Sequence, residues 1–268
     1  MLRDITLGQY FPGKSVIHRL DPRTKLIALV LYIIALFSAD GWISYGVNFV
    51  FLASVIAISQ IPLKALFKGM KSLALILVFT GLLNLFFTDG QTQLISLWGI
   101  SITLEGLLRA IRMIVRILML ISSTFLLTYT TSPIALTDGL ESLLSPLKIV
   151  RFPVHELSMM MCIALRFIPT LIEETDKIIS AQKARGADFE SGNILRRAKA
   201  LVPILVPLFI SAFRRADELA TAMESRCYQG GSGRTKMKLL FYKKIDFCAF
   251  AFTVLLIIAV IVLRNFGL

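Results

Sequence analysis

Long apolar runs, most of them without charged residues, alternate with short polar segments along most of the chain and predict membrane-spanning helices. Five runs have the composition of spans: 26–39, 42–60, 72–87, 107–129 and 247–263. At a rise of about 1.5 Å per residue these runs are short to normal for a hydrocarbon core of about 30 Å, so some should extend by a turn into the interface. Five spans place the two ends of the chain on opposite sides of the membrane.

The segment 130–244 follows a different pattern, in which shorter apolar stretches are interrupted by charges and prolines. It predicts a short helix that begins at Pro133 and ends near Ser145, because proline is favoured in a first helical turn. Two long helices should follow, from about 155 to 185 with a bend near Pro169, and from about 193 to 226 with prolines in its first half.

The composition indicates an integral membrane protein, and the charges of its loops indicate how it is oriented in the membrane. Apolar residues make up 56 % of the chain, the mean hydropathy is +0.76 and the net charge is +12. Lys and Arg concentrate in the first 25 residues and in the loop 61–71, whereas 38–44 and 87–103 have none. The positive-inside rule therefore predicts a cytoplasmic N-terminus, an extracytoplasmic C-terminus and a cytoplasmic segment 130–244, which holds 17 of the 29 basic residues.

The apolar stretches 157–168 and 202–210 allow an alternative in which they are two more membrane helices. The segment between them would then lie outside with six basic residues, against the charge rule, and the stretches are shorter than the roughly 20 residues that a span needs. We therefore expect cytoplasmic helices that lie against the membrane or beneath another membrane protein.

Near the N-terminus, Gly8 to Ser15 reads GQYFPGKS and matches the spacing of a phosphate-binding loop. That loop needs a buried strand before it and a helix that begins at its Lys. The preceding MLRDITL does not read as a strand, and Pro22 prevents a helix that begins at Lys14 from continuing. The match is interpreted as fortuitous.

The two long predicted helices end alike. The first closes with Asp176-KIISAQKA-Arg185 and the second with Asp217-ELATAMES-Arg226, so that Asp precedes Arg by nine residues in both. Small residues flank each Arg, giving the triplets Ala184-Arg185-Gly186 and Ser225-Arg226-Cys227. A single Arg at a helix end can be explained by the helix dipole. Two matching ends indicate paired prongs that enter carboxylate-lined grooves of a partner with two equivalent sockets.

These triplets, together with ALRFIPTL (164–171) and the arm GQYFPGKSVIHRLDPRTKL (8–26), resemble the T component of energy-coupling factor (ECF) transporters, the EcfT/CbiQ-like family. The resemblance covers nearly the whole chain. It implies an all-α integral membrane protein with about five transmembrane helices and a cytoplasmic coupling domain of about three helices, two of them long. The implied segments are a cytoplasmic arm (1–25), four spans (26–129), the coupling helices (130–244) and a last span (245–268).

By this resemblance the chain is a non-catalytic subunit in a bacterial cytoplasmic membrane. It would hold two ABC-type ATPase subunits, which bind ATP and Mg²⁺, and a membrane-embedded S component that captures a vitamin or metal ion. The two triplets would contact the ATPases. The chain itself would bind no cofactor, metal or nucleic acid. A T component shared among several vitamin-specific S components and one dedicated to a single S component, such as a biotin or a cobalt and nickel system, remain alternatives.

The sequence does not fit two other classes of membrane protein, a secondary transporter and a membrane enzyme. A secondary transporter usually carries a carboxylate near the bilayer midplane, but the acidic residues here lie at span ends. A membrane enzyme needs a catalytic cluster, and neither His18 nor His155 has an acidic partner at metal-ligand spacing. Arg109, Arg112 and Arg116 share one face of the fourth span, where they are either functional or packed inward.

Overall fold

The computed structural model describes residues 10–87, 92–97, 100–150, 152–187, 189, 193–230 and 239–266. The chain divides into two compact units. One contains residues 8–139 and 240–268 and is called the span unit here. The other contains 140–239 together with 1–7 and is called the helix-pair unit. Each is described by itself.

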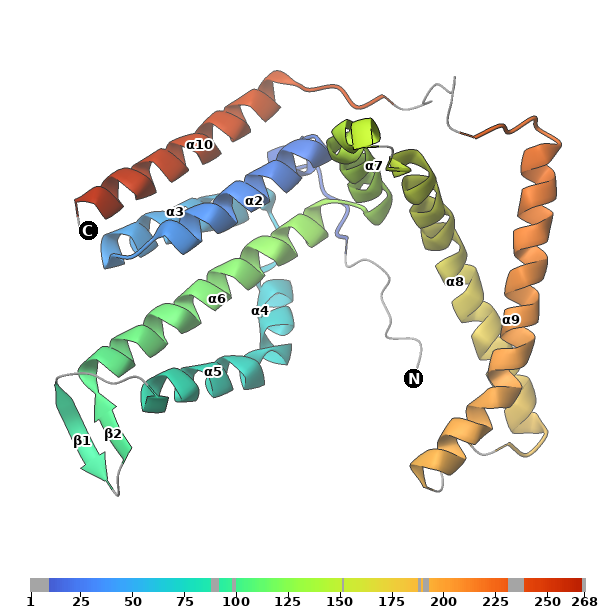
Figure 1. Ribbon diagram of the computed structural model, residues 1–268, viewed down its shortest axis with the longest axis horizontal. Coiled ribbons are helices and arrows are strands. Elements are labelled where there is room, and N and C mark those ends of the chain that lie inside the picture. Colours follow the sequence, from blue (N-terminus) through green and yellow to red (C-terminus); the bar gives the residue numbers. More distant parts are fainter. Residues whose placement is uncertain are drawn as a thin grey trace. The chain divides into compact units, whose positions relative to one another are not determined.

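The span unit is built from helices and one small hairpin (Figure 1). Its elements are α1 (Val16–Arg19), α2 (Pro22–Ser38), α3 (Trp42–Ser59), α4 (Leu63–Ser72), α5 (Ala74–Phe87), β1 (Gln93–Leu97), β2 (Ile100–Thr103), α6 (Leu104–Thr130) and α10 (Lys244–Asn265). Helix α7 (Pro133–Leu144) begins in this unit and ends in the other. The predicted all-α class is confirmed.

Local capping explains where the first helices begin. Ser15 caps α1 by accepting from the backbone N–H of His18, and Asp21 caps α2 by accepting from that of Arg23, with Pro22 in the first turn. Helix α1 therefore has only four residues. No helix continues from Lys14, which agrees with the rejection of a phosphate-binding loop; Gly8 and Gln9 lie outside the described residues.

The core of the span unit lies where α2 packs against α10 and α3. Tyr32 and Leu36 of α2 are buried there with Leu256 and Val260 of α10. Many large apolar side chains on these helices and on α5 are instead exposed, among them Val30, Phe37, Phe49, Val50, Leu75, Phe79, Phe252 and Leu255. Apolar exteriors over long helices are what a lipid environment requires, because the hydrocarbon core is the solvent of these faces.

Length and composition identify four membrane-crossing candidates among the described helices: α3, α6, α8 (Val154–Ala184) and α10. A fifth arises if α4 and α5, which meet at a 62° bend, count as one span. The number of candidate spans agrees with the expected total of about five, but the helices that make up the two sets differ. Helix α2 has 17 residues and is not among the candidates, whereas α8, predicted to be cytoplasmic, is.

Two features of the span unit were not predicted. The sequence predicts a loop over 61–71, where the structure has an amphipathic helix, α4, whereas the predicted span 72–87 corresponds to α5. The segment 87–103 was read as a loop, but it contains the antiparallel pair of β1 and β2, in register from Ile95↔Ile102 to Leu97↔Ile100. Its β-branched residues favour strands and are the local signal for this hairpin, whereas its lack of basic residues bears only on orientation.

The helix-pair unit consists mainly of two long helices, α8 and α9 (Ile194–Glu224), preceded by a 3₁₀ turn, η1 (Ser145–Val150). Both long helices have 31 residues and contain internal prolines, Pro169 in α8 and Pro203 and Pro207 in α9. Their bounds lie close to those expected from the sequence. They pack against each other and run in opposite directions (Figure 1).

Candidate functional site

The first of the two Arg-tipped helix ends closes α8 with a backbone motif that leaves the arginine free. Gly186 has a positive φ of 84°. Its N–H donates to the carbonyl of Lys183 at 3.0 Å, and the N–H of Ala187 donates to that of Gln182 at 3.0 Å. This pair of bonds is the Schellman motif, in which Arg185 is the C-cap residue. Two carbonyls of the last turn, those of Gln182 and Lys183, are therefore satisfied by backbone donors.

The second end repeats the motif. Cys227 has a positive φ of 57°, and its N–H donates to the carbonyl of Glu224 at 2.8 Å. The N–H of Tyr228 donates to the carbonyl of Met223 at 3.0 Å, so that Arg226 takes the position that Arg185 takes in the first end. The similarity that the sequence indicated is thus also a similarity of backbone geometry.

Both guanidinium groups are exposed, and neither makes a hydrogen bond or an ion pair with any described residue. The flanking positions are exposed as well: Ala184, Gly186, Ser225 and Cys227. Small neighbours leave the planar fork of each guanidinium accessible from several sides. The six predicted site residues therefore form two separate, sterically open arginine tips.

The tips lie at opposite ends of the helix pair. Tyr228 Oη lies 3.1 Å from Met159 Sδ, so that the end of α9 is beside the beginning of α8. Gln182 Nε2 donates to the carbonyl of Pro203 at 3.5 Å, so that the end of α8 is beside the beginning of α9. The 26 residues from Met159 to Arg185 correspond to a separation of roughly 40 Å between the tips at 1.5 Å per residue.

The middle and the start of the pair are held by charged contacts. Arg215 of α9 and Glu174 of α8 form an ion pair at 3.0 Å between the tips. At the beginning of α8, Glu141 lies 3.2 Å from His155 Nδ1 and accepts from Ser158 Oγ at 3.0 Å. His155 thus has a structural partner, and no group of three possible metal ligands occurs among the described residues.

Helix α9 also presents an apolar surface that nothing in its unit covers. Besides Leu195 in the first turn, its exposed large apolar side chains are Leu201, Val202, Leu205, Val206, Phe209, Ile210 and Phe213. Phe209 and Phe213 stack with ring centroids 6.4 Å apart. A contiguous patch of this kind on a soluble surface marks an interaction site for protein or membrane.

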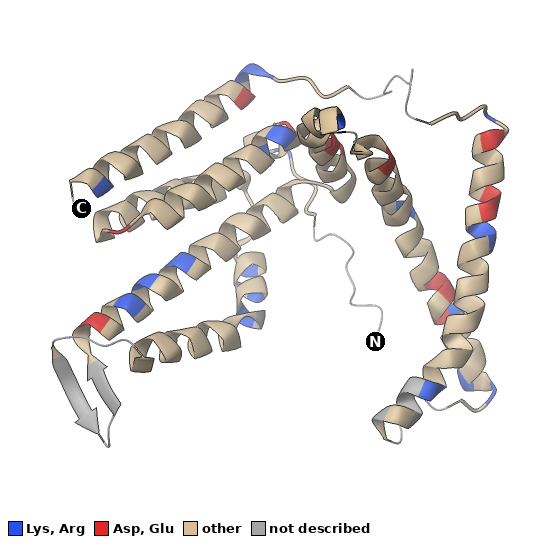
Figure 2. Cartoon of the chain, viewed as in Figure 1, with Lys and Arg blue, Asp and Glu red and all other residues tan. Residues whose placement is uncertain are grey.

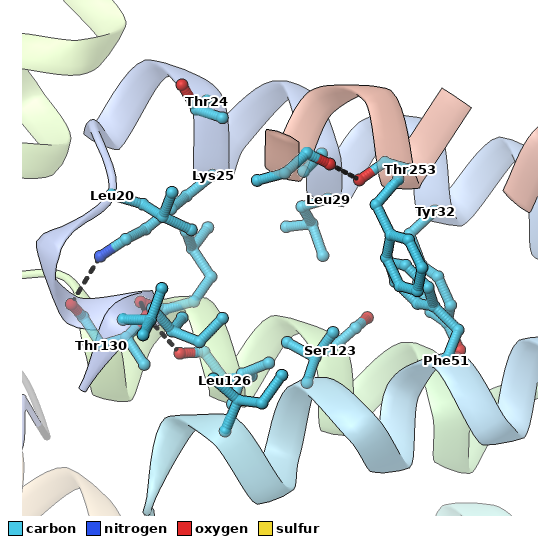
Figure 3. Close-up of a pocket in the computed structure, with 18 of the residues that line it drawn as sticks. Leu20, Thr24, Lys25, Leu29, Tyr32, Phe51, Ser123, Leu126, Thr130 and Thr253 are labelled. Atoms are coloured by element: carbon cyan, nitrogen blue, oxygen red, sulfur yellow. Dashed lines mark hydrogen bonds between the residues drawn. The ribbon is translucent and has the colours of Figure 1, made fainter. Parts of the chain in front are cut away.

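The span unit contains a separate cavity of about 390 Å³ between α1, α2, α3, α6 and α10 (Figure 3). Its lining is mostly apolar, with Leu20, Leu29, Tyr32, Phe51 and Leu126 around it. Hydroxyl groups in the lining, such as those of Ser123 and Thr253, donate to carbonyls of their own helices. The described lining contains no group of polar side chains that converge on one point, as a catalytic site requires. The cavity is therefore not a candidate catalytic site.

At one end of the cavity, a buried polar cluster joins distant parts of the span unit, and sequence reasoning did not find it. Lys25 Nζ donates to the carbonyl of Thr130 at 2.9 Å (Figure 3). Asp246 accepts from the backbone N–H groups of Asp21 at 2.8 Å and Lys243 at 2.7 Å. The available signal was a single carboxylate at the start of the last apolar run, which reads as an ordinary helix cap.

Comparisons with known proteins agree on one family. The family described as "Cobalt transport protein" (CbiQ) matches residues 13–237. Proteins named "Energy-coupling factor transporter transmembrane protein EcfT" are 53 % identical in Ruminiclostridium cellulolyticum, over 98 % of both chains, and 55 % in Thermosediminibacter oceani, over 98 % of this chain and 99 % of that one. The Bacillus subtilis protein of this name is 48 % identical, over 92 % of this chain and 93 % of its own. The chain therefore belongs to the EcfT/CbiQ-like family, the T components of energy-coupling factor transporters.

Proposed function

We propose that this multi-pass membrane protein is the scaffold and coupling subunit of an ECF-type ABC importer. In this function Arg185 and Arg226 each engage one ABC-type ATPase subunit, and α8 and α9 transmit ATP-driven motion to an S component. The chain itself is non-catalytic, and ATP is hydrolysed by its partners. The observation that carries the proposal is the pair of exposed arginine tips, with the same backbone motif, at opposite ends of one antiparallel helix pair.

The helix ends argue against a purely local role for the two arginines. A C-terminal Arg is often explained by carbonyls that lack donors. Here the carbonyls of Gln182 and Lys183 accept backbone N–H groups, as do those of Met223 and Glu224. Each guanidinium keeps its donors for a partner, where bidentate pairing with a carboxylate is stronger than a neutral hydrogen bond.

The antiparallel arrangement suits a two-fold partner. Two equal helices that run in opposite directions are related by an approximate two-fold axis across the pair, and so are their tips. A dimer of equal or similar ATPases offers two equivalent sockets related in the same way. The separation of roughly 40 Å allows the tips to reach two subunits rather than one.

The exposed apolar surface of α9 supports the second partner. Burial of exposed side chains such as Phe209 and Phe213 is favourable by about 25 cal/mol per Å² of apolar surface removed from water. A membrane-embedded S component that rests on this surface would cover it. Movement of α9 by the ATPases would then act on the S component directly, and so promote release of its vitamin or other micronutrient into the cell.

Charge supports the proposed orientation, with the N-terminus in the cytoplasm, the C-terminus outside and 130–244 in the cytoplasm. Helix α8 is apolar enough to span, but its second half carries Glu173, Glu174, Asp176, Lys177 and Lys183. A span there would place Arg185 and the basic residues that follow it outside, against the positive-inside rule. A T component dedicated to cobalt and nickel or to biotin remains the alternative to a shared one.

Co-purification tests the proposal. The chain is tagged in its native host, purified in mild detergent as the wild type and as Arg185→Glu/Arg226→Glu, and its companions are identified. Two ATPase subunits and one or more S components should accompany the wild type, and the S components name the substrates. The double variant should lose the ATPases and keep its fold.

The matched control is Lys177→Glu/Arg214→Glu, which makes the same charge change on exposed positions of the same two helices away from the tips. It should retain the ATPases. If both double variants lose the ATPases, the change in net charge explains the loss and the arginine tips have no specific role. A wild type that purifies without ATPases would contradict the proposal.

A further inference from the structure

A second, polar pocket of the span unit lies apart from the arginine tips. It has a volume of about 250 Å³. Its lining comes from α3, α5, α6 and the turn between α2 and α3: Asp40, Tyr45, Asn84, Arg109, Arg112, Met113 and Arg116. Figure 2 shows the basic positions as successive bands on α6 near the end that follows β2. Three guanidinium groups thus converge on one hollow.

The two inner arginines contact only neutral groups of the described chain. Arg112 Nη1 donates to the carbonyl of Asp40 at 3.2 Å, and Arg116 Nη2 donates to that of Ala39 at 3.2 Å. The guanidinium of Arg116 also lies over the rings of Phe37 and Tyr45, 5.4 and 5.6 Å from their centroids. The carbonyls and rings orient these side chains and leave their charge uncompensated.

In the pocket lining, the buried Nε–H groups of Arg112 and Arg116 have no hydrogen-bond partner among the described residues. A buried donor without an acceptor is unfavourable, and more so on a charged group. Native proteins rarely keep such donors unless a water, an ion or a ligand meets them. Together with the three arginines that line the pocket, these unpaired donors indicate a site for an acceptor with several oxygens.

The charge balance indicates that the acceptor is an anion. Asp40 is the one described carboxylate that lines the pocket, and its Oδ2 pairs with Arg264 Nε at 3.0 Å. Glu105, one turn before Arg109, accepts from Thr92 Oγ1 at 2.8 Å, and Asp89 lies outside the described residues. Three arginines against one shared carboxylate leave an excess of about two positive charges in the lining.

We propose that this pocket binds the phosphate group of an anionic phospholipid. Arginine forks match the oxygens of a phosphate, and a nearby aromatic ring strengthens the site. The pocket lies beside the first turn of α3, where the exposed Trp42 occupies the kind of position that tryptophan takes at a membrane interface. The acyl chains would then lie along the exposed apolar faces of the neighbouring spans.

Native mass spectrometry of the full-length chain, purified with its companions, tests this site. The complex is titrated with phosphatidylglycerol and, separately, with phosphatidylcholine. The wild type should retain phosphatidylglycerol more tightly. Arg112→Gln/Arg116→Gln should weaken its binding about tenfold or more, whereas Asp40→Asn, which removes the competing carboxylate, should strengthen it. A misfolded variant cannot produce that gain.

The control Lys64→Gln/Lys68→Gln removes two exposed charges on α4 and should leave the tight binding unchanged. Equal weakening in this control, or equal retention of the two lipids, would overturn the proposal. A third titration uses inorganic phosphate at millimolar concentration. Displacement of the lipid by free phosphate would also overturn it, because the ligand would then be the soluble oxyanion.

Discussion

Asp246 provides a direct test of what holds the last helix in the span unit. Its side chain is 2 % exposed, and its two oxygens accept from the backbone N–H groups of Asp21 and Lys243 at 2.8 and 2.7 Å. Asp21 is the N-cap of α2 and Lys243 the N-cap of α10, so one carboxylate joins the beginnings of two helices. Asp246→Ala removes both acceptors and leaves two backbone donors without them, a buried one at Asp21 and a partly buried one at Lys243.

The expected loss of stability follows from the two hydrogen bonds that Asp246 accepts. A hydrogen bond to a charged group contributes about 1.5–3 kcal/mol, so the Ala variant should lose about 3–6 kcal/mol of stability. Asp246→Asn keeps one acceptor and should lose about half of that. The assay is thermal unfolding of the purified protein in detergent, followed by circular dichroism, and the Ala variant should melt roughly 10 °C lower.

Asp40→Ala is the matched control in the same unit. Its ion pair with Arg264 is more than half exposed on both sides, and such pairs contribute about 0–1 kcal/mol. The melting temperature should therefore fall much less than in the Asp246 variant. Equal shifts in the two variants would refute the reasoning, because burial and backbone donors would then not distinguish Asp246 from a surface carboxylate.

Two further predictions concern the helix-pair unit. Gly186→Val introduces a β-branched residue at a φ of 84° and should destabilise the end of α8 by about 1–2 kcal/mol, so hydrogen exchange in the last turn of α8 should become faster. Cys227→Gly removes a side chain from a residue with positive φ and should stabilise the end of α9, so exchange in the last turn of α9 should become slower. Glu141→Ala removes the partner of His155 and Ser158 and should accelerate exchange in the first turn of α8, with the last turn of α9 as the internal control.

Much of the helical architecture could be predicted from local patterns. Apolar runs between polar turns located α2, α3 and α10, and prolines with matching charged ends located α7, α8 and α9. The arginine triplets were identified for the same reason, since a repeated pattern at two helix ends is visible in sequence. These features depend on residues close together in the chain.

Features that depend on distant residues could not be predicted in this way. The contact of Asp246 with Asp21 joins positions 225 apart, and the placement of Arg185 and Arg226 at opposite ends follows from how α8 packs against α9. The role of Arg112 was left open because its nearest partner, the carbonyl of Asp40, is 72 residues away. The spacing of the three arginines shows that they share one face of α6, but it does not show which residues pack against that face.

Site-specific photo-crosslinking at the arginine tips tests the central claim most directly. A photoreactive amino acid at Ala184 or Ser225, beside each exposed guanidinium, should trap an ATPase subunit in the intact complex. The same probe at Lys177 or Arg214, farther along the same helices, should not. ATPase adducts from both tips and from neither control are the predicted result. Tips that give no ATPase adduct, in complexes that contain the ATPases, would contradict the account.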